Sequence, residues 1–227
     1  MADDSLTLAQ YVIRDCKARG LAHFFGIPGS GSPMDLMDAA REEGLEFVIA
    51  GHESSAVISA AYYGLFKETA GLMVGIKGVG LGNAVGGVVN AATERVPVVV
   101  VCEARGSKVP LSLPLAQHTG PQAAFFGNML KHAGVLAAGT VAQAWSAATA
   151  AALSHGRPGA SFLDLPGDLG RTPVGAAEAA QCANEAAATS TQWVQRAGAA
   201  QDACEAAAAV LAQYRRPVVI AGADLHV

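Results

Sequence analysis

Glu53 is the residue whose position most strongly indicates chemistry. It follows an apolar run at residues 47–50 that is typical of a buried strand, and it precedes an apolar segment that is typical of a helix. In an α/β layer, a strand-to-helix turn is where ligands bind, and desolvation there disfavours the ionised form of a carboxylate. Such a group can share a proton with a ligand. The structural alternative is an ordinary acid in the first turn of a helix, which the helix dipole stabilises by about 0.3–1 kcal/mol.

A glycine-rich loop, Gly-Val-Gly-Leu-Gly-Asn at residues 78–83, is the second candidate element. Asn83 stands where the dinucleotide-binding fingerprint needs its third glycine, and no Gly-Lys-Ser/Thr completes a Walker A loop. The glycines could simply let the next helix pack closely on the sheet, assisted by Gly82 and Gly86. That alternative does not explain Asn83, which is a poor former of helix interiors.

Two further segments carry polar groups after expected strands. Pro28, Gly29 and Ser30 follow the first strand, and Gln117 and His118 follow a proline-containing stretch after the fourth. Pro-Gly forms a turn in any protein, and a Gln-His pair in such a loop could equally be solvated. Both segments are therefore candidate binding loops with a plain alternative.

The composition excludes several classes of protein. The 227 residues are 52% hydrophobic and 15% charged, which is enough for one large core. With 15 basic against 19 acidic residues and no basic block, we expect no nucleic-acid partner. The apolar stretches are too short to span a membrane and the first residues are acidic, so we expect a cytoplasmic protein without a membrane partner. The cysteines lack metal-ligand spacing, and we expect buried thiols and no metal site; they are Cys16, Cys102, Cys182 and Cys204.

Short β-branched or aromatic runs alternate with helical segments as far as residue 168. Strands are expected at 23–27, 46–50, 72–76, 96–102, 134–138 and 161–165, and helices at 6–19, 33–43, 54–67, 81–93, 122–131 and 141–155. This alternation predicts an α/β fold, with a doubly wound, mostly parallel six-stranded sheet and helices on both faces. Right-handed crossovers place the carboxyl ends of the strands, and the candidate loops with them, at one edge.

The character of the chain changes after Asp168. We expect a first domain at residues 1–170, a linker at 171–191 that is rich in Ala and lacks apolar periodicity, and the start of an incomplete second α/β domain at 192–227. That last part comprises a helix at 193–213 and a strand at 216–222, which cannot bury a core of their own. The chain is therefore expected to be a piece of a longer protein or an unusually short relative.

Several motifs in the same order resemble the N-terminal pyrimidine-binding domain of thiamine diphosphate-dependent enzymes. They are Phe-Gly-Ile-Pro-Gly-Ser at 25–30, His-Glu-x-x-Ala at 52–56, Gly-x-Gly-x-Gly-Asn-Ala at 78–84, Gln-His at 117–118 and Gly-Arg-Pro-Gly at 156–159. The resemblance covers about residues 5–170. The tail at 216–222 is similar to the first strand of the middle domain in the pyruvate decarboxylase, benzoylformate decarboxylase and acetolactate synthase group. The loop at 80–85 is closer to phosphonopyruvate and sulfopyruvate decarboxylases.

The resemblance implies a catalytic role for Glu53. In the family the matching carboxylate hydrogen-bonds the aminopyrimidine of thiamine diphosphate and thereby promotes loss of the thiazolium C2 proton, after which the cofactor attacks a 2-oxo acid. It also implies that Gly29 and Ser30 line the substrate side of the pocket, and that Pro28 and Gly29 help to bind the cofactor. Gly80 and Asn83 would shape the wall near the pyrimidine. Gln117 and His118 would come from a loop that reaches toward the active centre.

The sequence also departs from the family. Lys77 stands where acetolactate synthases often have Ser, which would put a cation near the cofactor unless it turns to solvent. The family's Gly-Asp-Gly…Asn motif for diphosphate and Mg²⁺ occurs nowhere, since residues 167–170 read Gly-Asp-Leu-Gly. The resemblance therefore implies half of a cofactor site.

The leading hypothesis is the pyrimidine-binding half of a 2-oxo acid decarboxylase or carboligase. Its partner would be a diphosphate-binding domain or subunit that carries Mg²⁺, in a homodimer or tetramer. The alternatives are a non-catalytic dimerisation or regulatory module that retains the fold, and a flavin or nucleotide binder of the doubly wound class.

Overall fold

A computed structural model describes residues 6–109, 122–154, 157–180 and 200–220 of the chain. Within these residues, six strands form one sheet in which every neighbouring pair is parallel, in the order β2-β1-β3-β4-β6-β5. The strands are β1 (His23–Gly26), β2 (Glu46–Ile49), β3 (Gly71–Gly75), β4 (Val98–Ala104), β5 (Leu130–Val135) and β6 (Ala160–Pro166). The predicted α/β fold with a six-stranded, doubly wound sheet is confirmed.

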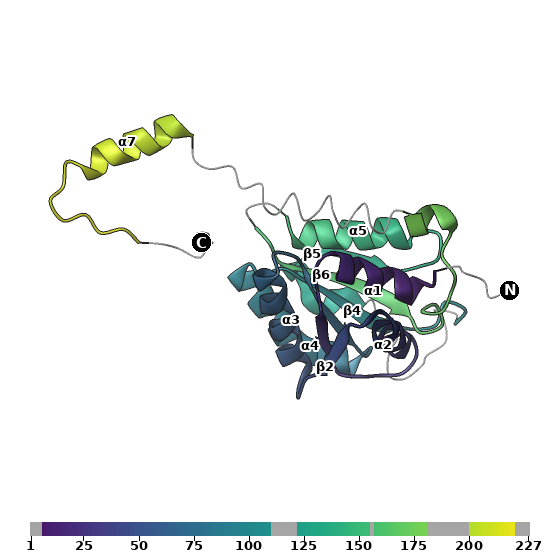
Figure 1. Cartoon of the computed structure of the whole chain (residues 1–227). Helices are drawn as coiled ribbons and strands as arrows, with labels where there is room; N and C mark the ends of the chain where they lie inside the picture. Colours follow the sequence, from purple (N-terminus) through teal and green to yellow (C-terminus); the bar gives the residue numbers. More distant parts are fainter. Residues whose placement is uncertain (1–5, 110–121, 155–156, 181–199, 221–227) are drawn as a thin grey trace.

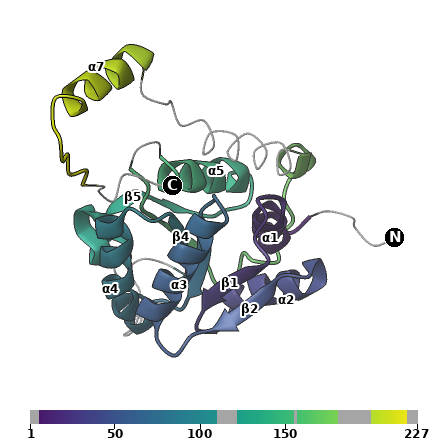
Figure 2. The ribbon, with the colours of Figure 1, turned by 60° about the vertical axis from the view of Figure 1, so that its left-hand side comes forward.

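Helices cover both faces of this sheet (Figures 1 and 2). One face carries α1 (Leu8–Ala18), α2 (Ser32–Glu43) and α5 (Val141–Ala152). The other carries α3 (Glu53–Phe66), α4 (Val79–Glu94) and the 3₁₀ segment η1 (Gln122–Met129). Beyond these, residues 176–180 are helical, and α7 (Gln201–Leu211) has no buried residue.

The core consists of two apolar layers, one on each side of the sheet. Side chains of a strand alternate between its faces, and β4 shows this because Val99 and Val101 enter the layer under α1 and α5, whereas Val98, Val100 and Cys102 enter the layer under α3 and α4. Central strands buried on both faces read as continuous apolar runs. That property made β3 and β4 recognisable in the sequence.

The strand order reverses between β1 and β3. From β1 the chain passes outward to β2 through α2, and α3 then carries it back across β1 to β3. In open α/β sheets ligands bind outside the carboxyl ends of the strands at such a reversal. The loops after β1 and β3 and the start of α3 are therefore the first place to look for a site.

Two elements differ from the sequence prediction. The helix predicted at 122–131 is the 3₁₀ segment η1, which is interrupted at Gly127 (φ 54°, ψ −127°), and β5 begins at Leu130, before the predicted 134–138. A positive φ at Gly127 breaks the helical ladder and releases the chain into the sheet. The second difference is that residues 217–220 form no strand, although a strand was predicted at 216–222. A strand forms by pairing, and no described strand pairs with this segment.

The start of α1 is bound to the segment that follows β6. The N–H of Leu8 donates to the Thr172 carbonyl and that of Ala9 to the Gly170 carbonyl, each at 2.9 Å, and Val174 is buried in the core. This closure lies close to the boundary expected at residue 170, and the domain division itself stays a prediction.

No helix among the described residues is both long and apolar enough to cross a membrane.

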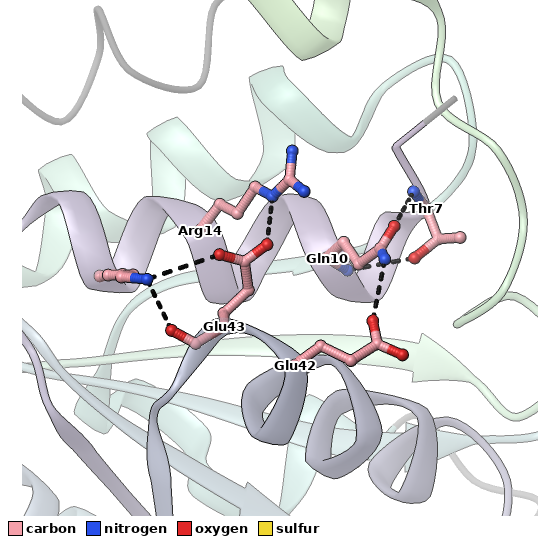
Figure 3. A network of polar contacts seen from close by, with 6 residues as sticks. Thr7, Gln10, Arg14, Glu42 and Glu43 are labelled. Carbon is pink, nitrogen blue, oxygen red and sulfur yellow. Dashed lines mark hydrogen bonds and ion pairs between the residues drawn. The ribbon is translucent and has the colours of Figure 1, made fainter. Parts of the chain in front are cut away.

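Polar contacts hold α1 against α2 (Figure 3). Thr7 and Gln10 form a capping box at the start of α1, Gln10 also donates to Glu42, and Arg14 pairs with Glu43 at 2.5 Å. Exposed pairs of this kind contribute about 0–1 kcal/mol each. They orient α2 on α1 more than they stabilise the fold.

A buried polar cluster holds α1 against α5. Asp15 is fully buried and pairs with Arg19, whose side chain is also buried, and the Trp145 indole N–H donates to the Asp15 carboxylate at 2.6 Å. Removal of one partner would leave the other charge buried without compensation. This cluster is therefore the polar contact on which the packing of that face depends most.

We expect Asp15→Ala to lower the free energy of unfolding by about 3–5 kcal/mol, because the Arg19 guanidinium would stay buried without a counter-charge. Arg14→Ala, which removes an exposed ion pair from the same helix, should cost less than about 1 kcal/mol. Urea unfolding of the two variants measures both values. Equal losses would contradict the proposed role of the buried cluster.

Candidate active site

Glu53 is the first residue of α3. His52 is the N-cap, with an extended backbone, and its Nδ1 accepts a hydrogen bond from the Ser54 N–H at 3.2 Å. The helix therefore begins one residue before the predicted start, and the Glu53 carboxylate lies in its first turn. Only 6% of Glu53 is exposed. A carboxylate at this place is favoured by the helix N-terminus and disfavoured by its burial.

The first turn of α4 contacts this carboxylate. Asn83 donates from Nδ2 to Glu53 Oε2 at 3.1 Å. A side chain at Gly80 would place its Cβ 3.0 Å from Glu53 Oε1. Among the described residues Asn83 is the one recorded hydrogen-bond partner of the carboxylate, so Oε1 keeps its capacity to bond a ligand.

Small residues let α3 and α4 approach closely enough for this contact. A Cβ at Gly87 would lie 2.6 Å from both the Ser54 carbonyl oxygen and Val57 Cβ. The Ser54 hydroxyl donates to the Asn83 carbonyl at 2.5 Å and accepts from the Gly87 N–H at 3.2 Å. Of the two glycines expected to assist close packing, Gly86 does so, because a Cβ there would lie 3.1 Å from Ser54 Oγ, whereas a Cβ at Gly82 would meet nothing within 4 Å. The glycines of α4 are therefore explained in part by the close packing of α3 on α4 and in part by the contact with Glu53.

The backbone of α3 also rests directly on β3. A Cβ on Gly64 would overlap the Gly71 backbone, and a Cβ on Gly71 would overlap the Ala60 carbonyl. This contact fixes the depth at which α3 lies on the sheet. Together with the contact to α4 it determines where Glu53 stands.

The loop after β1 joins the same group through Ile76. A Cβ on Gly29 would lie 3.2 Å from Ile76 Cβ, and a Cβ on Gly80 would overlap the other side of the Ile76 side chain. Pro28 and Ser30, on either side of Gly29, are exposed. The structure therefore brings Gly29, Gly80, Asn83 and Glu53 to one edge of the sheet.

A buried polar network next to this edge was not predicted from the sequence. Its centre is Glu103 near the end of β4, which is 5% exposed and pairs with Lys77 at 2.7 Å. Gln122 donates from Nε2 to the Glu103 carbonyl at 3.0 Å and to Asp164 Oδ1 at 2.6 Å, and its Oε1 accepts from the Gly78 N–H at 3.1 Å. Burial raises the pKa of the Asp164 carboxyl, and the Gln122 hydrogen bond opposes this only in part.

Lys77 therefore turns toward Glu103. The Ser30 hydroxyl also donates to Glu103, at 3.4 Å, so the pair connects the loops after β1 and β3 to β4. Side chains at Gly31 (φ 60°) and Gly167 would come within 2.9 and 2.7 Å of Glu103 Oε1. A signal was present in the sequence, because Glu103 directly follows the apolar run at 96–102, much as Glu53 comes shortly after the apolar run at 47–50.

Two of the predicted site residues, Gln117 and His118, lie outside the described residues. Among the described residues no three His, Cys, Asp or Glu side chains lie close enough together to hold a metal ion.

Cys16 and Cys102 are buried as predicted, and Cys182 is not described. Cys204 is exposed, contrary to the prediction, because α7 buries none of its residues.

The comparisons with known proteins agree on one family. The family described as "Thiamine pyrophosphate enzyme, N-terminal TPP binding domain" matches residues 6–130. The catabolic acetolactate synthase of Raoultella terrigena is 29% identical over 221 residues, which cover 94% of this chain and 36% of that protein. The acetolactate synthase of Bacillus subtilis (strain 168) is 28% identical over 222 residues, covering 94% and 35%. The sulfoacetaldehyde acetyltransferase of Alcaligenes xylosoxydans xylosoxydans is 31% identical over 102 residues, covering 45% and 17%. The chain spans about a third of the length of the two synthases.

We expect Gly87→Ala to lower the free energy of unfolding by about 1–3 kcal/mol, because its Cβ would force α4 away from α3. Gly82→Ala in the same helix should be neutral or stabilising by about 0.5–1 kcal/mol, since its Cβ meets no neighbour and alanine favours helix. Chemical denaturation separates the two. A Gly87→Ala protein as stable as Gly82→Ala would show that α3 and α4 are not in tight contact.

Proposed function

Because the chain belongs to the thiamine pyrophosphate enzymes, through their N-terminal TPP-binding domain, we propose that it is the aminopyrimidine-binding half of an active site. The enzyme is a 2-oxo acid decarboxylase or carboligase, and Glu53 is the residue that activates the cofactor. The observation that carries this proposal is the buried Glu53 carboxylate, which is held by Asn83 at Oε2 and keeps Oε1 for a ligand.

The residues present fit an aminopyrimidine. A Cβ at Gly80 would overlap Ile76 and lie 3.0 Å from Glu53 Oε1, so glycine at this position leaves that oxygen uncovered by residue 80. Ile76 supplies an apolar surface between Gly29 and Gly80. An edge with one carboxylate oxygen, one amide and otherwise apolar surroundings suits a planar heterocycle with a ring nitrogen.

When bound, thiamine diphosphate supplies the carbon nucleophile and the electron sink of the reaction. The chain supplies a proton-sharing group, because Oε1 of Glu53 bonds a ring nitrogen and holds or accepts the proton there. Asn83 fixes the carboxylate so that Oε1 faces the ring. Burial of Glu53 keeps water from competing for the same oxygen.

The remaining predicted residues are assigned to positions around the contact between Glu53 and the ring. We assign Gly29 and Ser30 to the substrate side of the pocket, Pro28 and Gly29 to cofactor binding, and Gln117 and His118 to a loop at the active centre. The hydroxyl of Ser30 is oriented by Glu103, whose charge is balanced by Lys77, so this wall presents a neutral polar surface. Such a surface suits the keto and carboxylate oxygens of a small 2-oxo acid.

The diphosphate and Mg²⁺ are assigned to another domain or subunit, as part of a homodimer or tetramer. The relatives support this, since the synthases named above are about three times longer than the part that this chain matches. The names of the relatives, acetolactate synthase and sulfoacetaldehyde acetyltransferase, favour the carboligase side of the proposal over simple decarboxylation.

Glu53→Gln should reduce turnover of a 2-oxo acid by about 10²-fold or more in the enzyme that contains this chain together with its diphosphate-binding domain. Exchange of the cofactor C2 proton, followed by NMR, should slow to a similar extent, because Gln cannot take part in proton sharing. Glu68→Gln, at an exposed position just after α3, is the matched control and should leave both rates unchanged. Near-normal turnover of Glu53→Gln would refute the assignment.

Calorimetric titration of thiamine diphosphate and Mg²⁺ into this chain alone should give weak heat or none, because the chain lacks the anchor for the diphosphate. Addition of the diphosphate-binding domain should restore saturable binding. Tight binding to the chain alone would show that the half-site interpretation is wrong.

A further inference from the structure

A second concave site lies at the opposite edge of the sheet, where the strands begin. It is a hollow of about 470 Å³ formed by the end of α4, the junction of η1 and β5, and the segment that leads into β6. This volume falls in the range of about 300–1,000 Å³ that is usual for small-molecule sites. The candidate active site lies at the carboxyl edge, so this hollow is separate from it.

Three cations from three different elements line the hollow. They are Arg95, which follows α4, Lys131 in β5, and Arg157 before β6, and the lining residues include no Asp or Glu. Within the described part of the chain, neither Lys131 nor Arg157 has a carboxylate partner. The carboxyl end of α4 carries a partial negative charge of about −0.5 that opposes an anion there, and the three full positive charges outweigh it.

The backbone is irregular at two of these cations. Arg95 is left-handed (φ 55°, ψ 49°), a conformation that glycine adopts far more readily than arginine. Lys131 lies at an irregularity in the β5–β6 pairing, where the register shifts between Leu130 and His132, and such bulges re-aim side chains. The absence of a side chain at Gly159 gives room for the Lys131 stem, since a Cβ there would lie 3.3–3.9 Å from its methylene carbons.

The rest of the lining is largely apolar and includes Val89, Ala92, Met129 and Pro158, with Thr93 and Asn128 as neutral polar groups. A hollow with a cationic side and an apolar side matches a ligand that has a charged end and an uncharged body. A guanidinium fork binds phosphate oxygens in pairs, and an ammonium adds a point charge.

We propose that this hollow binds a phosphorylated small molecule, with the phosphate on Arg95, Lys131 and Arg157 and the uncharged body on the apolar wall. The charged phosphate would account for the cations in the lining, and the uncharged body would account for its apolar residues. The proposal is independent of the cofactor half-site, because it shares no residue with the edge that carries Glu53.

The test is a calorimetric titration of the purified chain with ADP, inorganic phosphate and adenosine. ADP should bind saturably at one site and more weakly as the salt concentration rises, inorganic phosphate should bind at least about tenfold more weakly than ADP, and adenosine should not bind measurably. Lys131→Ala and Arg157→Ala should each weaken ADP binding by about tenfold or more.

Lys108→Ala is the matched control, since it removes one exposed positive charge at the other edge of the sheet, and it should leave ADP binding unchanged. Circular dichroism confirms that each variant is folded. The absence of saturable ADP binding, or ADP binding that Lys131→Ala and Arg157→Ala leave intact, would overturn the proposal. Equal affinity for ADP and inorganic phosphate would refute the role of the apolar wall.

Discussion

The contact between α3 and α4 is the constraint on which the candidate site depends. At Gly87 the two helices meet with no room for a Cβ, and Ser54 links their backbones through one donated and one accepted hydrogen bond. Because Gly80 and Asn83 lie one to two turns before Gly87 in the same helix, this contact brings them to the Glu53 carboxylate. The position of the Glu53 side chain is thus set by the distance between α3 and α4. That distance is hard to change, because the backbones of the two helices are in contact.

The buried polar network at the carboxyl edge cannot be explained by stability. Replacement of a buried ion pair such as Lys77–Glu103 by apolar residues is often neutral or stabilising, because desolvation of two charges costs about as much as their attraction returns. The pair instead connects Ser30 after β1 and Lys77 after β3 to Glu103 of β4. The two loops that meet at the strand-order reversal are thereby held to β4 in one arrangement, which is a property that a binding site requires.

Much of the fold could be predicted because local signals agree with each other. The apolar run of β4 and the periodicity of α1 and α5 identified their elements to within a few residues. Glu53 and Asn83 could be singled out as polar residues in places where neither suits the local structure. The role of Gln122 could not be predicted from the sequence. Its side chain hydrogen-bonds Gly78, Glu103 and Asp164 at the same time, and these residues are distant from it in the chain. The break at Gly127 was also invisible, since a positive φ follows from the path to β5 and not from local preference.

Cys102 gives this edge of the sheet a natural chemical probe. Its thiol is fully buried, and burial together with the charges of Asp164 and Glu53 raises its pKa far above the usual range, so the reactive thiolate is scarce in the folded protein. In the register of the sheet Cys102 stands between Gly75 and Asp164, beside the loops that carry the candidate site. Alkylation of this thiol therefore has to wait for the layer under α3 and α4 to open, and its rate measures how often these helices leave the sheet at the place where Glu53 is held.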